Sequence, residues 1–456
     1  MRLGNASHQQ SGQPERVVTG KGEAHADAAR DEARPAFQQQ TGLGREGLLW
    51  QVLSRENMAA AWKRVKANKG SAGVDGLTIE QAPEFLKTHW SRIRQELLDG
   101  TYRPQAVRRV EIPKPAGGMR ELGIPTVVDR LIQQALLQIL QPLIDPTFSE
   151  FSYGFRPGRS AHDAVRQAQQ YAQEGYRVVV DVDLEKFFDL VNHDILMDRL
   201  AKRIADKAVL RLIRRYLQAG VMAAGVVLER EQGTPQGGPL SPLLANVLLD
   251  EVDKALEKRG HRFARYADDC NVYLRSQKAG ERVLLFLRSL YEKLHLRVNE
   301  KKTEVGLVFG RKFLGYSLRG WSGDTVKISV ATKAIDTFKQ RIREITRRAG
   351  GRGMVQIAQR LGKYLPGWKA YFRLAQTPTT FRDLDSWIRR RLRAVQLKQW
   401  KRGTTIYRNL RALGTTHEVA AQVAAAGRRW WHCSRSNLHR VLTVAYFDSI
   451  GIPRLT

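Results

Sequence analysis

The four residues Tyr266-Ala267-Asp268-Asp269 decide how this chain is interpreted. Alternating polar and apolar residues precede them at 261–265 and follow them at 271–275, which predicts two strands joined by a tight turn. Two adjacent carboxylates at a hairpin tip repel each other, and the arrangement is costly unless a cation lies between their oxygens. An Asp-Asp pair taken alone is most often an ordinary solvated turn, so the case depends on acids elsewhere in the sequence.

A second acidic strand end provides those acids. The β-branched run Val178-Val179-Val180 continues into Asp181-Val182-Asp183, and strand alternation puts both acids on one face. If this strand lies beside the hairpin, Asp183, Asp268 and Asp269 converge. An all-oxygen set of this kind suits Mg²⁺, and two Mg²⁺ ions about 3.5–4 Å apart can serve an in-line displacement at phosphorus.

The charge of the chain indicates a polyanionic partner. The net charge is +31 and the pI is about 10.5. Residues 333–456 contain 26 Lys and Arg residues against 6 Asp and Glu residues, so most of this charge falls near the end of the sequence. Hydrophobic residues make up 42% of the 456 residues, enough for more than one domain with its own core.

Cysteine content and hydropathy indicate the cellular compartment in which we expect the protein. Cys270 and Cys433 are the only cysteines, so the sequence has neither a disulfide framework nor paired zinc ligands, and we expect a reducing cytoplasm. No signal-peptide core follows Met1, and no apolar run is long enough to span a membrane. Residues 1–45 are rich in Gln, Gly, Ala and Arg, and we expect them to form a disordered leader.

Capping and turn residues predict where several elements begin and end. We expect helix N-caps at Ser54, Asp129, Ser160 and Ser241, a helix end at Pro142, and a strand at 312–316. His193 follows Asn192, and we expect it to be a local cap or packing residue rather than a metal ligand.

Two loops rich in glycine and basic residues have a functional and a structural interpretation. The loop at 68–76 contains Lys69 and either contacts a nucleic-acid strand or simply connects two helices. The loop at 151–160 combines aromatic rings with Arg156 and Arg159, which suits base stacking and phosphate contact, but a packed Ω-loop has the same composition.

Two further segments could contact a nucleotide. Lys114 and Arg120 flank a predicted hairpin turn, where two cations could hold a triphosphate or could be solvated charges. Glycines in the loop at 233–242, which contains Pro235 and Gln236, would let the backbone approach a ligand closely.

After Lys333 the pattern is helical and basic. The exposed faces there have charges of a single sign at high density, which favours binding to an RNA or DNA backbone over a merely solvated surface. The basic residues that we expect to contact nucleic acid in this region are Arg341, Arg389, Arg390, Arg391, Arg393 and Lys398.

From residue 48 to residue 456 the sequence resembles the reverse transcriptases encoded by bacterial group II introns, also called maturases. The resemblance depends on the ordered set of motifs rather than on any single one. The motifs are 68–76, 120–126, 151–160, 183–188, 233–242, 266–269, 299–303 and 313–316.

The resemblance implies an α+β right-hand polymerase with fingers, a palm whose antiparallel sheet carries the Tyr266–Asp269 hairpin, and an all-α thumb or maturase domain. We expect an N-terminal extension and fingers at 46–175, the palm at 176–332, the helical thumb at 333–429 and a short C-terminal segment at 430–456. Longer relatives have an endonuclease with paired cysteines and histidines at this end, and we expect none here.

The same resemblance assigns roles to individual residues. Asp183, Asp268 and Asp269 match the catalytic, metal-binding carboxylates, with the carbonyl of Leu184 as a further ligand. Phe188 matches the aromatic gate that excludes a ribose 2′-hydroxyl. The remaining nucleotide-binding positions implied by the family are Lys114, Arg120, Pro235, Gln236 and Lys302.

The implied cofactor is a pair of Mg²⁺ ions, with Mn²⁺ as a substitute. The implied partners are group II intron RNA, an RNA template with a DNA primer, dNTPs and target DNA, in the bacterial cytoplasm near the nucleoid and without a membrane. The oligomeric state stays open. Two alternatives also stay open: a splicing cofactor with idle polymerase chemistry, and a domesticated reverse transcriptase in phage defence, repair or diversity generation.

Overall fold

The computed structural model describes residues 47–113, 119–223, 226–228, 232–234, 237–320, 325–347, 350–426, 430–434 and 438–456. The expected leader at 1–45, together with Lys114, Pro235 and Gln236, lies outside the described residues, and only the backbone is described for Arg120. All described residues belong to one unit, Thr41–Thr456.

Helices alternate with short strands as far as Val330, and from Thr332 onward the described elements are helices. The helices before that point are α1 (Leu48–Val52), α2 (Arg55–Ala67), α3 (Ala82–Leu98), α4 (Val127–Ile144), α5 (Ala161–Gln173), α6 (Phe187–Leu190), α7 (His193–Ala201), α8 (Lys207–Gln218), α9 (Ser241–Lys258) and α10 (Gln277–Lys293). Those after it are α11 (Thr332–Ile345), α12 (Met354–Tyr371), α13 (Pro378–Trp400), α14 (Gly403–Ala412), α15 (His417–Ala425), α16 (Trp430–Cys433), α17 (Leu438–Val441) and α18 (Val444–Ser449).

The strands form three described sheets. One has the order β2-β1-β4-β5, one is the pair β10-β9, and the central one has the order β6-β7-β3-β8. The strands are β1 (Val107–Pro113), β2 (Met119–Ile124), β3 (Val178–Val182), β4 (Val221–Ala223), β5 (Val226–Leu228), β6 (Arg262–Tyr266), β7 (Asp269–Leu274), β8 (Glu304–Leu307), β9 (Tyr316–Gly320) and β10 (Val326–Val330).

The central sheet brings the two acidic segments together. β3 pairs antiparallel with β7, so that Val182 lies opposite Cys270, and β6 pairs antiparallel with β7 through Tyr266 and Asp269. The predicted hairpin is therefore confirmed, and its acidic tip lies at the sheet edge where β3 ends.

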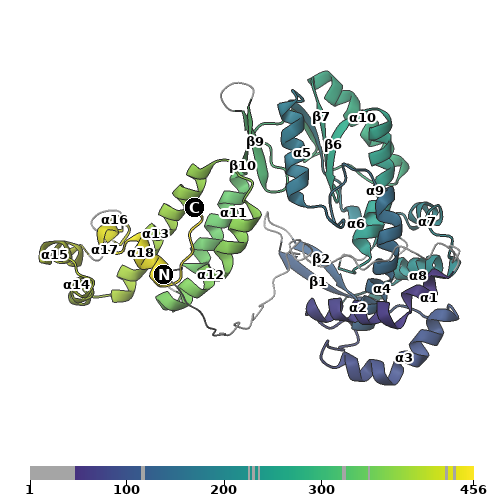
Figure 1. Cartoon of the computed structure of the whole chain (residues 1–456), viewed down its shortest axis with the longest axis horizontal. Helices are drawn as coiled ribbons and strands as arrows, with labels where there is room; N and C mark the ends of the chain where they lie inside the picture. Colours follow the sequence, from purple (N-terminus) through teal and green to yellow (C-terminus); the bar gives the residue numbers. More distant parts are fainter. Residues whose placement is uncertain are drawn as a thin grey trace, which may run out of the picture. The chain divides into compact units, whose positions relative to one another are not determined.

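The two faces of this sheet pack against different helices (Figure 1). Val180 and Val182 share a core with residues of α9 and α10, whereas Val179 packs in a second core with residues of α5. Alternation therefore places Asp181 on the Val179 face. In β7 the buried Tyr273 belongs to this second core, so Asp269 points to the same side as Asp181.

The structure confirms two of the expected helix caps. Ser54 accepts a hydrogen bond from the backbone N–H of Asn57, and Ser160 forms a capping box with Asp163. At α9 the expectation is wrong by one residue, because Ser241 is the first helical residue and Leu240 is the N-cap.

The other expected helix boundaries also need correction. Thr126, not Asp129, caps α4: its hydroxyl accepts from the Asp129 N–H and donates to the Asp129 carboxylate. α4 continues two residues beyond Pro142 to Ile144, because a proline in the last turn removes one hydrogen bond without ending the helix. His193 is a packing residue as expected, buried with Nε2 2.6 Å from the carbonyl oxygen of Gly233.

The expected strand at 312–316 is mostly a turn. Phe313 and Tyr316 form an isolated antiparallel bridge, and only Tyr316 belongs to a strand, β9. Leu314 and Gly315 between them have φ values of 50° and 81°, in the left-handed region. The alternation of apolar residues suggested a strand, but the glycine permits the tight reversal instead.

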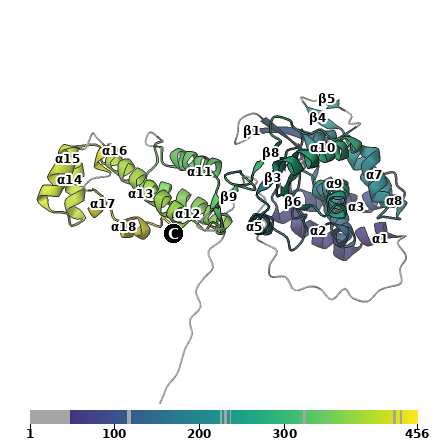
Figure 2. The same cartoon turned by 90° about the horizontal axis from the view of Figure 1, so that it is seen from above.

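The helices after β10 share a core with α5 and part of the central sheet. α11, α12 and α13 pack through buried residues such as Phe338, Leu361 and Ile388, and α11 and α12 run side by side (Figures 1 and 2). In the part of the chain that the structure describes, no helix is long and apolar enough to cross a membrane.

Candidate active site at the edge of the central sheet

The hairpin turn has a constrained backbone. Tyr266 and Asp269 are paired, which leaves Ala267 and Asp268 as a two-residue loop. Ala267 has a φ of 56°, a backbone conformation that residues other than glycine rarely adopt. A Cβ added to Gly154 would lie 2.3 Å from the backbone nitrogen of Ala267. The loop at 151–160 therefore packs directly on the turn.

Arg265, the residue before the motif, is fully buried and connects the turn to its surroundings. Its guanidinium forms an ion pair with Asp253, and it also donates to Asn246, Ser152 and the carbonyl of Ala267. Burial alone would lower the pKa of Arg265, but the Asp253 carboxylate outweighs this effect and raises it. The guanidinium is therefore a permanent cation behind the hairpin.

A cavity of about 310 Å³ opens at the edge where β3 and β7 meet. Three acids border it, Asp181 and Asp183 from the β3 segment and Asp269 from β7. The other residues that line it are Lys302, Arg311, Lys312, Phe313 and Leu314. Acids and cations that are distant in the sequence thus face one space.

Asp183 is held by the segment that follows Val298. Its Oδ2 accepts hydrogen bonds from Asn299 Nδ2 at 3.0 Å and from Lys302 Nζ at 3.1 Å. Its backbone carbonyl accepts from the Asn299 N–H at 2.8 Å, and its N–H donates to Thr303 Oγ1 at 3.2 Å. The adjacent Leu184 has a buried side chain and bridges to Val298.

The acids around the cavity affect one another electrostatically. Restricted solvation, followed by the negative charge of Asp268, raises the pKa of Asp269 to about 7, and Asp181 and Asp183 add to the effect. Burial raises the pKa of Asp181 to about 6, and Asp183 contributes to this rise. Burial and the neighbouring carboxylates therefore disfavour the ionised forms of Asp181 and Asp269, an effect that a bound cation would relieve.

The donor set suits a divalent cation, because carboxylate oxygens from two neighbouring strands border the same cavity. The set is incomplete in this conformation. Across the described ranges, no three Asp, Glu, His or Cys side chains lie close enough together to hold a metal ion. Asp183 is directed at Lys302 instead, and Asp268 is not among the residues that line the cavity.

The predicted sugar gate lies next to the predicted nucleotide loop. Phe188 is half-buried in α6 and packs edge-on against Phe187, with ring centroids 5.1 Å apart. Its carbonyl accepts from the Thr234 N–H at 2.7 Å, and a Cβ on Gly233 would lie 3.0 Å from the same oxygen. The described part of the loop at 233–242 is therefore hydrogen-bonded to the segment that contains Phe188.

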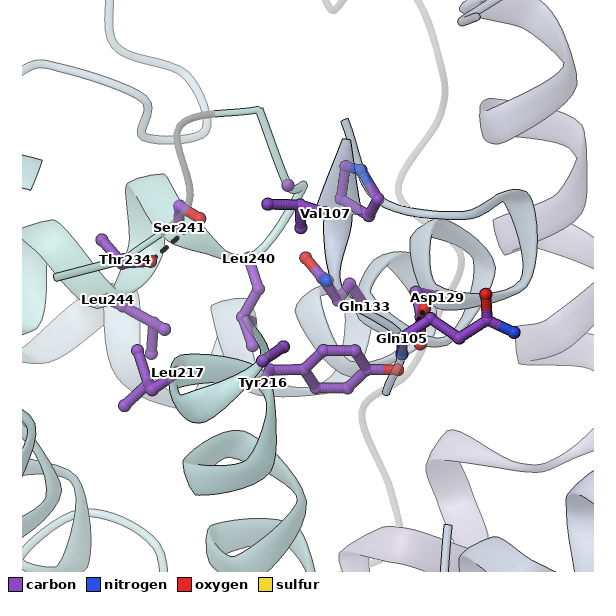
Figure 3. Close-up of a pocket in the computed structure, with 13 residues that line it drawn as sticks. Gln105, Val107, Asp129, Gln133, Tyr216, Leu217, Thr234, Leu240, Ser241 and Leu244 are labelled. Atoms are coloured by element: carbon purple, nitrogen blue, oxygen red, sulfur yellow. Dashed lines mark hydrogen bonds between the residues drawn. The ribbon is translucent and has the colours of Figure 1, made fainter. Parts of the chain in front are cut away.

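A second, much smaller cavity of about 20 Å³ lies where β1, α4 and the start of α9 meet (Figure 3). The buried Asp129 borders it and accepts hydrogen bonds from Tyr102 and Thr126, both at 2.7 Å. Burial raises the pKa of Asp129. The space is enough for about one water molecule, so we regard it as a packing feature and not as a substrate site.

The basic residues predicted to contact nucleic acid in the loops at 68–76 and 151–160 differ in exposure. Lys69 is exposed, in a loop anchored by Arg130 Nη2 donating to the carbonyl of Ser71 at 2.8 Å. Arg159 is half-buried, with its guanidinium over the ring of Tyr153. Arg156 is buried, and its donors are directed at Asp145 and at the Ser149 and Ser152 carbonyls. This geometry gives Arg156 a structural role and not the expected phosphate contact.

The basic residues of α13 fall into the same two classes. Arg389 is 2% exposed and pairs with Asp385 and Asp448, and Arg393 is buried and donates to the Leu442 carbonyl at 2.8 Å. These contacts correct the expectation that both contact nucleic acid. The expectation remains a prediction for the more accessible members of the set, Arg341, Arg390, Arg391 and Lys398.

Sequence reasoning did not assign a role to Asp181, Arg311 or Lys312, which also line the acidic cavity. Asp181 had a usable signal, since it lies on the same strand face as Asp183. Arg311 and Lys312 had none, because they immediately precede the turn at 313–315, where the sequence pattern predicts a strand.

The family of this chain follows from comparison with known proteins. Residues 112–318 match the family described as reverse transcriptase (RNA-dependent DNA polymerase), and residues 335–414 match the group II intron maturase-specific domain. The chain belongs to the reverse transcriptases of the group II intron-encoded type. Members of the reverse transcriptase family use divalent metal ions.

Three relatives show the extent of the similarity. Protein YkfC of Escherichia coli is 33% identical over 313 residues, covering 59% of this chain and 82% of YkfC. Group II intron-encoded protein LtrA of Lactococcus lactis is 39% identical over 206 residues, covering 45% of this chain but 34% of LtrA. In a solved structure titled a partial Cas6-RT-Cas1–Cas2 complex, one chain is 27% identical, covering 54% of this chain and 43% of that one, with a TM-score of 0.36.

Proposed function

We propose that this chain copies RNA into DNA by nucleotidyl transfer at the edge of the central sheet, with Asp183, Asp268 and Asp269 as the catalytic carboxylates. One observation supports this most strongly. The ends of β3 and β7, which belong to distant parts of the sequence, place Asp183 and Asp269 on one cavity, with Asp268 adjacent in the turn.

The proposed metal site uses the carboxylates of these three residues and the backbone carbonyl of Leu184. Two bound Mg²⁺ ions, or Mn²⁺ in their place, would supply positive charge that favours the ionised primer 3′-hydroxyl and the leaving pyrophosphate. Asp183 Oδ2 is 3.1 Å from the ammonium group of Lys302, and we propose that this oxygen exchanges the lysine for a metal ion when the site fills. The freed Lys302 then becomes a cation available to the triphosphate.

Other residues are proposed to bind the nucleotide. Lys114 and Arg120 would neutralise the triphosphate, Pro235 and Gln236 would border the incoming base, and Phe188 would exclude a 2′-hydroxyl. These roles fit a division into fingers (46–175), palm (176–332) and thumb (333–429), followed by a short segment at 430–456, which we also propose.

Primer extension on an RNA template tests the assignment. Asp268→Asn should lower the rate at least about 10³-fold, because losing a metal-binding carboxylate costs several kcal/mol of transition-state stabilisation. The matched control is Asp194→Asn, an exposed acid on α7 that pairs with Arg214. Binding of primer and template should persist in both variants. Extension at the normal rate by Asp268→Asn would refute the assignment.

A second role, in splicing, is supported by the maturase-specific match at residues 335–414. We propose that this region binds group II intron RNA, assists its splicing and supports its insertion into target DNA. A splicing assay with the RNA that flanks the reading frame, run with Asp268→Asn, separates splicing from primer extension. Splicing should continue without extension. If the native protein splices but does not extend a primer, it is a splicing cofactor with an idle polymerase.

A further inference from the structure

We infer that Arg265 is a positioning residue that fixes the catalytic turn, together with Asp253 and Asn246 of α9. The inference depends on the proposed polymerase function, since it concerns the same turn. It assigns Arg265 no contact with substrate or metal, and it explains how the turn keeps an unusual conformation.

The guanidinium of Arg265 uses all of its donors on four residues, which lie in α9, in the loop at 151–160 and in the turn itself. Nε donates to Asp253 Oδ1 at 2.7 Å, and Nη2 donates to Asp253 Oδ2 at 2.5 Å and to Ser152 Oγ at 2.8 Å. Nη1 donates to Asn246 Oδ1 and to the Ala267 carbonyl, both at 2.9 Å. Arg265 and Asp253 are both 0% exposed. A planar fork with five donors fits such a set, whereas an ammonium group does not.

The bond to the Ala267 carbonyl is the one that matters for function. It joins the buried cation to the loop residue immediately before Asp268. Ala267 has a φ of 56°, so its own conformational preference opposes this turn. The surrounding contacts must therefore hold it in place.

Asn246 completes the arrangement from the other side of the turn. Its side chain accepts from Arg265 and donates to the Gly154 carbonyl at 2.9 Å, and Gly154 packs on the Ala267 backbone. The arginine thus fixes the carbonyl side of Ala267, and the asparagine fixes the glycine that covers its nitrogen side. The two residues are hydrogen-bonded to each other, so one connected network contacts both sides of the turn.

A second ion pair made by a buried acid of α9 provides a comparison, although Arg203 is partly exposed and Asp250 also pairs with Lys254. Arg203 Nη2 lies 2.6 Å from Asp250 Oδ2, and Asp250 is 0% exposed like Asp253. Arg203 donates to Arg199, Thr147 and Asp250, none of which belongs to the turn. If Arg265 only stabilised the fold, disturbing either pair would have the same consequences.

The experiment compares Arg265→Lys with Arg203→Lys in the full chain, below the unfolding temperature of each. Arg265→Lys keeps the charge facing Asp253 but loses the fork that reaches Ala267. We expect the single-turnover extension rate to fall about 100-fold, because a catalytic group displaced by about 1 Å has an effect of this size. The Kd for primer and template should change less than threefold. More Mg²⁺ should be needed for half-maximal rate.

A measurement without metal or substrate tests the cause directly. Amide hydrogen exchange across residues 266–270 should accelerate in Arg265→Lys and stay unchanged in Arg203→Lys. If Arg265→Lys does not fold, Asn246→Ala replaces it, since this change leaves the Arg265–Asp253 pair in place and should produce the same two effects more weakly.

The possible results separate the inference from the proposed function. If the native protein fails to extend a primer, the proposed function fails. If it extends and Arg265→Lys matches it in rate, metal dependence and amide exchange, the positioning role is refuted. A loss of rate in Arg203→Lys equal to that in Arg265→Lys also refutes the role, because the effect is then one of general stability.

Discussion

Lys302 places its ammonium nitrogen 3.1 Å from Oδ2 of Asp183, so the first proposed catalytic carboxylate is paired with a lysine. The side chain of Lys302 is 66% exposed, and such a pair contributes little to stability. The lysine is free to move away when a stronger cation arrives. We infer that it moves from Asp183 to the nucleotide triphosphate.

Lys302→Ala should therefore have two opposite effects. Divalent ions should bind more tightly to the protein without nucleotide, because their competitor at Asp183 is removed. The KM for dNTP should rise about tenfold, because a charge-assisted contact to the triphosphate is lost. Calorimetry with Mn²⁺ and steady-state extension measure the two effects. Lys301→Ala, which removes the neighbouring exposed charge, is the control. Identical behaviour of both variants would contradict the inferred movement of Lys302 from Asp183 to the triphosphate.

Phe188→Ala should allow ribonucleotides to be incorporated. The Phe188 ring packs against Phe187, and the backbone carbonyl of Phe188 accepts a hydrogen bond from Thr234. Replacing the ring should therefore open space beside the proposed nucleotide site while this backbone hydrogen bond remains. We expect the preference for dNTP over rNTP, measured as a ratio of kcat/KM values, to fall at least about tenfold. Leu190→Ala on the same short helix is the control. An unchanged ratio would mean that Phe188 is not the gate.

The sequence was sufficient for features that depend on local patterns. The hairpin at Tyr266–Asp269, the cap at Ser54 and the capping box at Ser160 all follow from short spacings, and the structure confirms each of them. The placement of Asp181 on the same strand face as Asp183 followed from alternation.

The sequence was insufficient where long-range contacts decide the outcome. Nothing near Arg156 distinguishes a buried arginine from one that binds phosphate, because its partner Asp145 is set by the fold. Arg389 has a partner at i−4, Asp385, but this spacing is also common on exposed helix faces, and the second partner Asp448 is set by the fold. The role of Arg265 was hidden for the same reason, since its acceptors lie on three other segments. The turn at 313–315 was missed because two positive φ values interrupt an apparently regular strand.

The basic residues of the proposed thumb should separate into two groups by experiment. Arg389→Ala removes one partner of a buried pair and leaves Asp385 without its guanidinium, so unfolding should become easier by about 3–5 kcal/mol. Thermal or denaturant unfolding measures this effect.

Arg341→Ala should behave in the opposite way. Arg341 is exposed and forms a surface ion pair with Glu344, so stability should change by less than about 1 kcal/mol. Binding to intron RNA should weaken, and the dependence of log K on log salt should become shallower by about one phosphate contact. If RNA binding by Arg341→Ala has an unchanged salt dependence, Arg341 does not contact the RNA backbone.

Gly154→Ala tests the contact between the loop at 151–160 and the catalytic turn. A Cβ at this position would lie 2.3 Å from the Ala267 nitrogen, a backbone atom that can move only if the turn moves. We therefore expect at least a tenfold loss of extension rate with primer and template binding retained, since displaced catalytic groups react slowly. Gly367→Ala in α12 is the matched control, because no described atom apart from the nearby backbone of its own helix lies within 4 Å of the added Cβ, and alanine favours the helix. Normal extension by Gly154→Ala would mean that the turn tolerates displacement, and the catalytic importance of its geometry would then have to be abandoned.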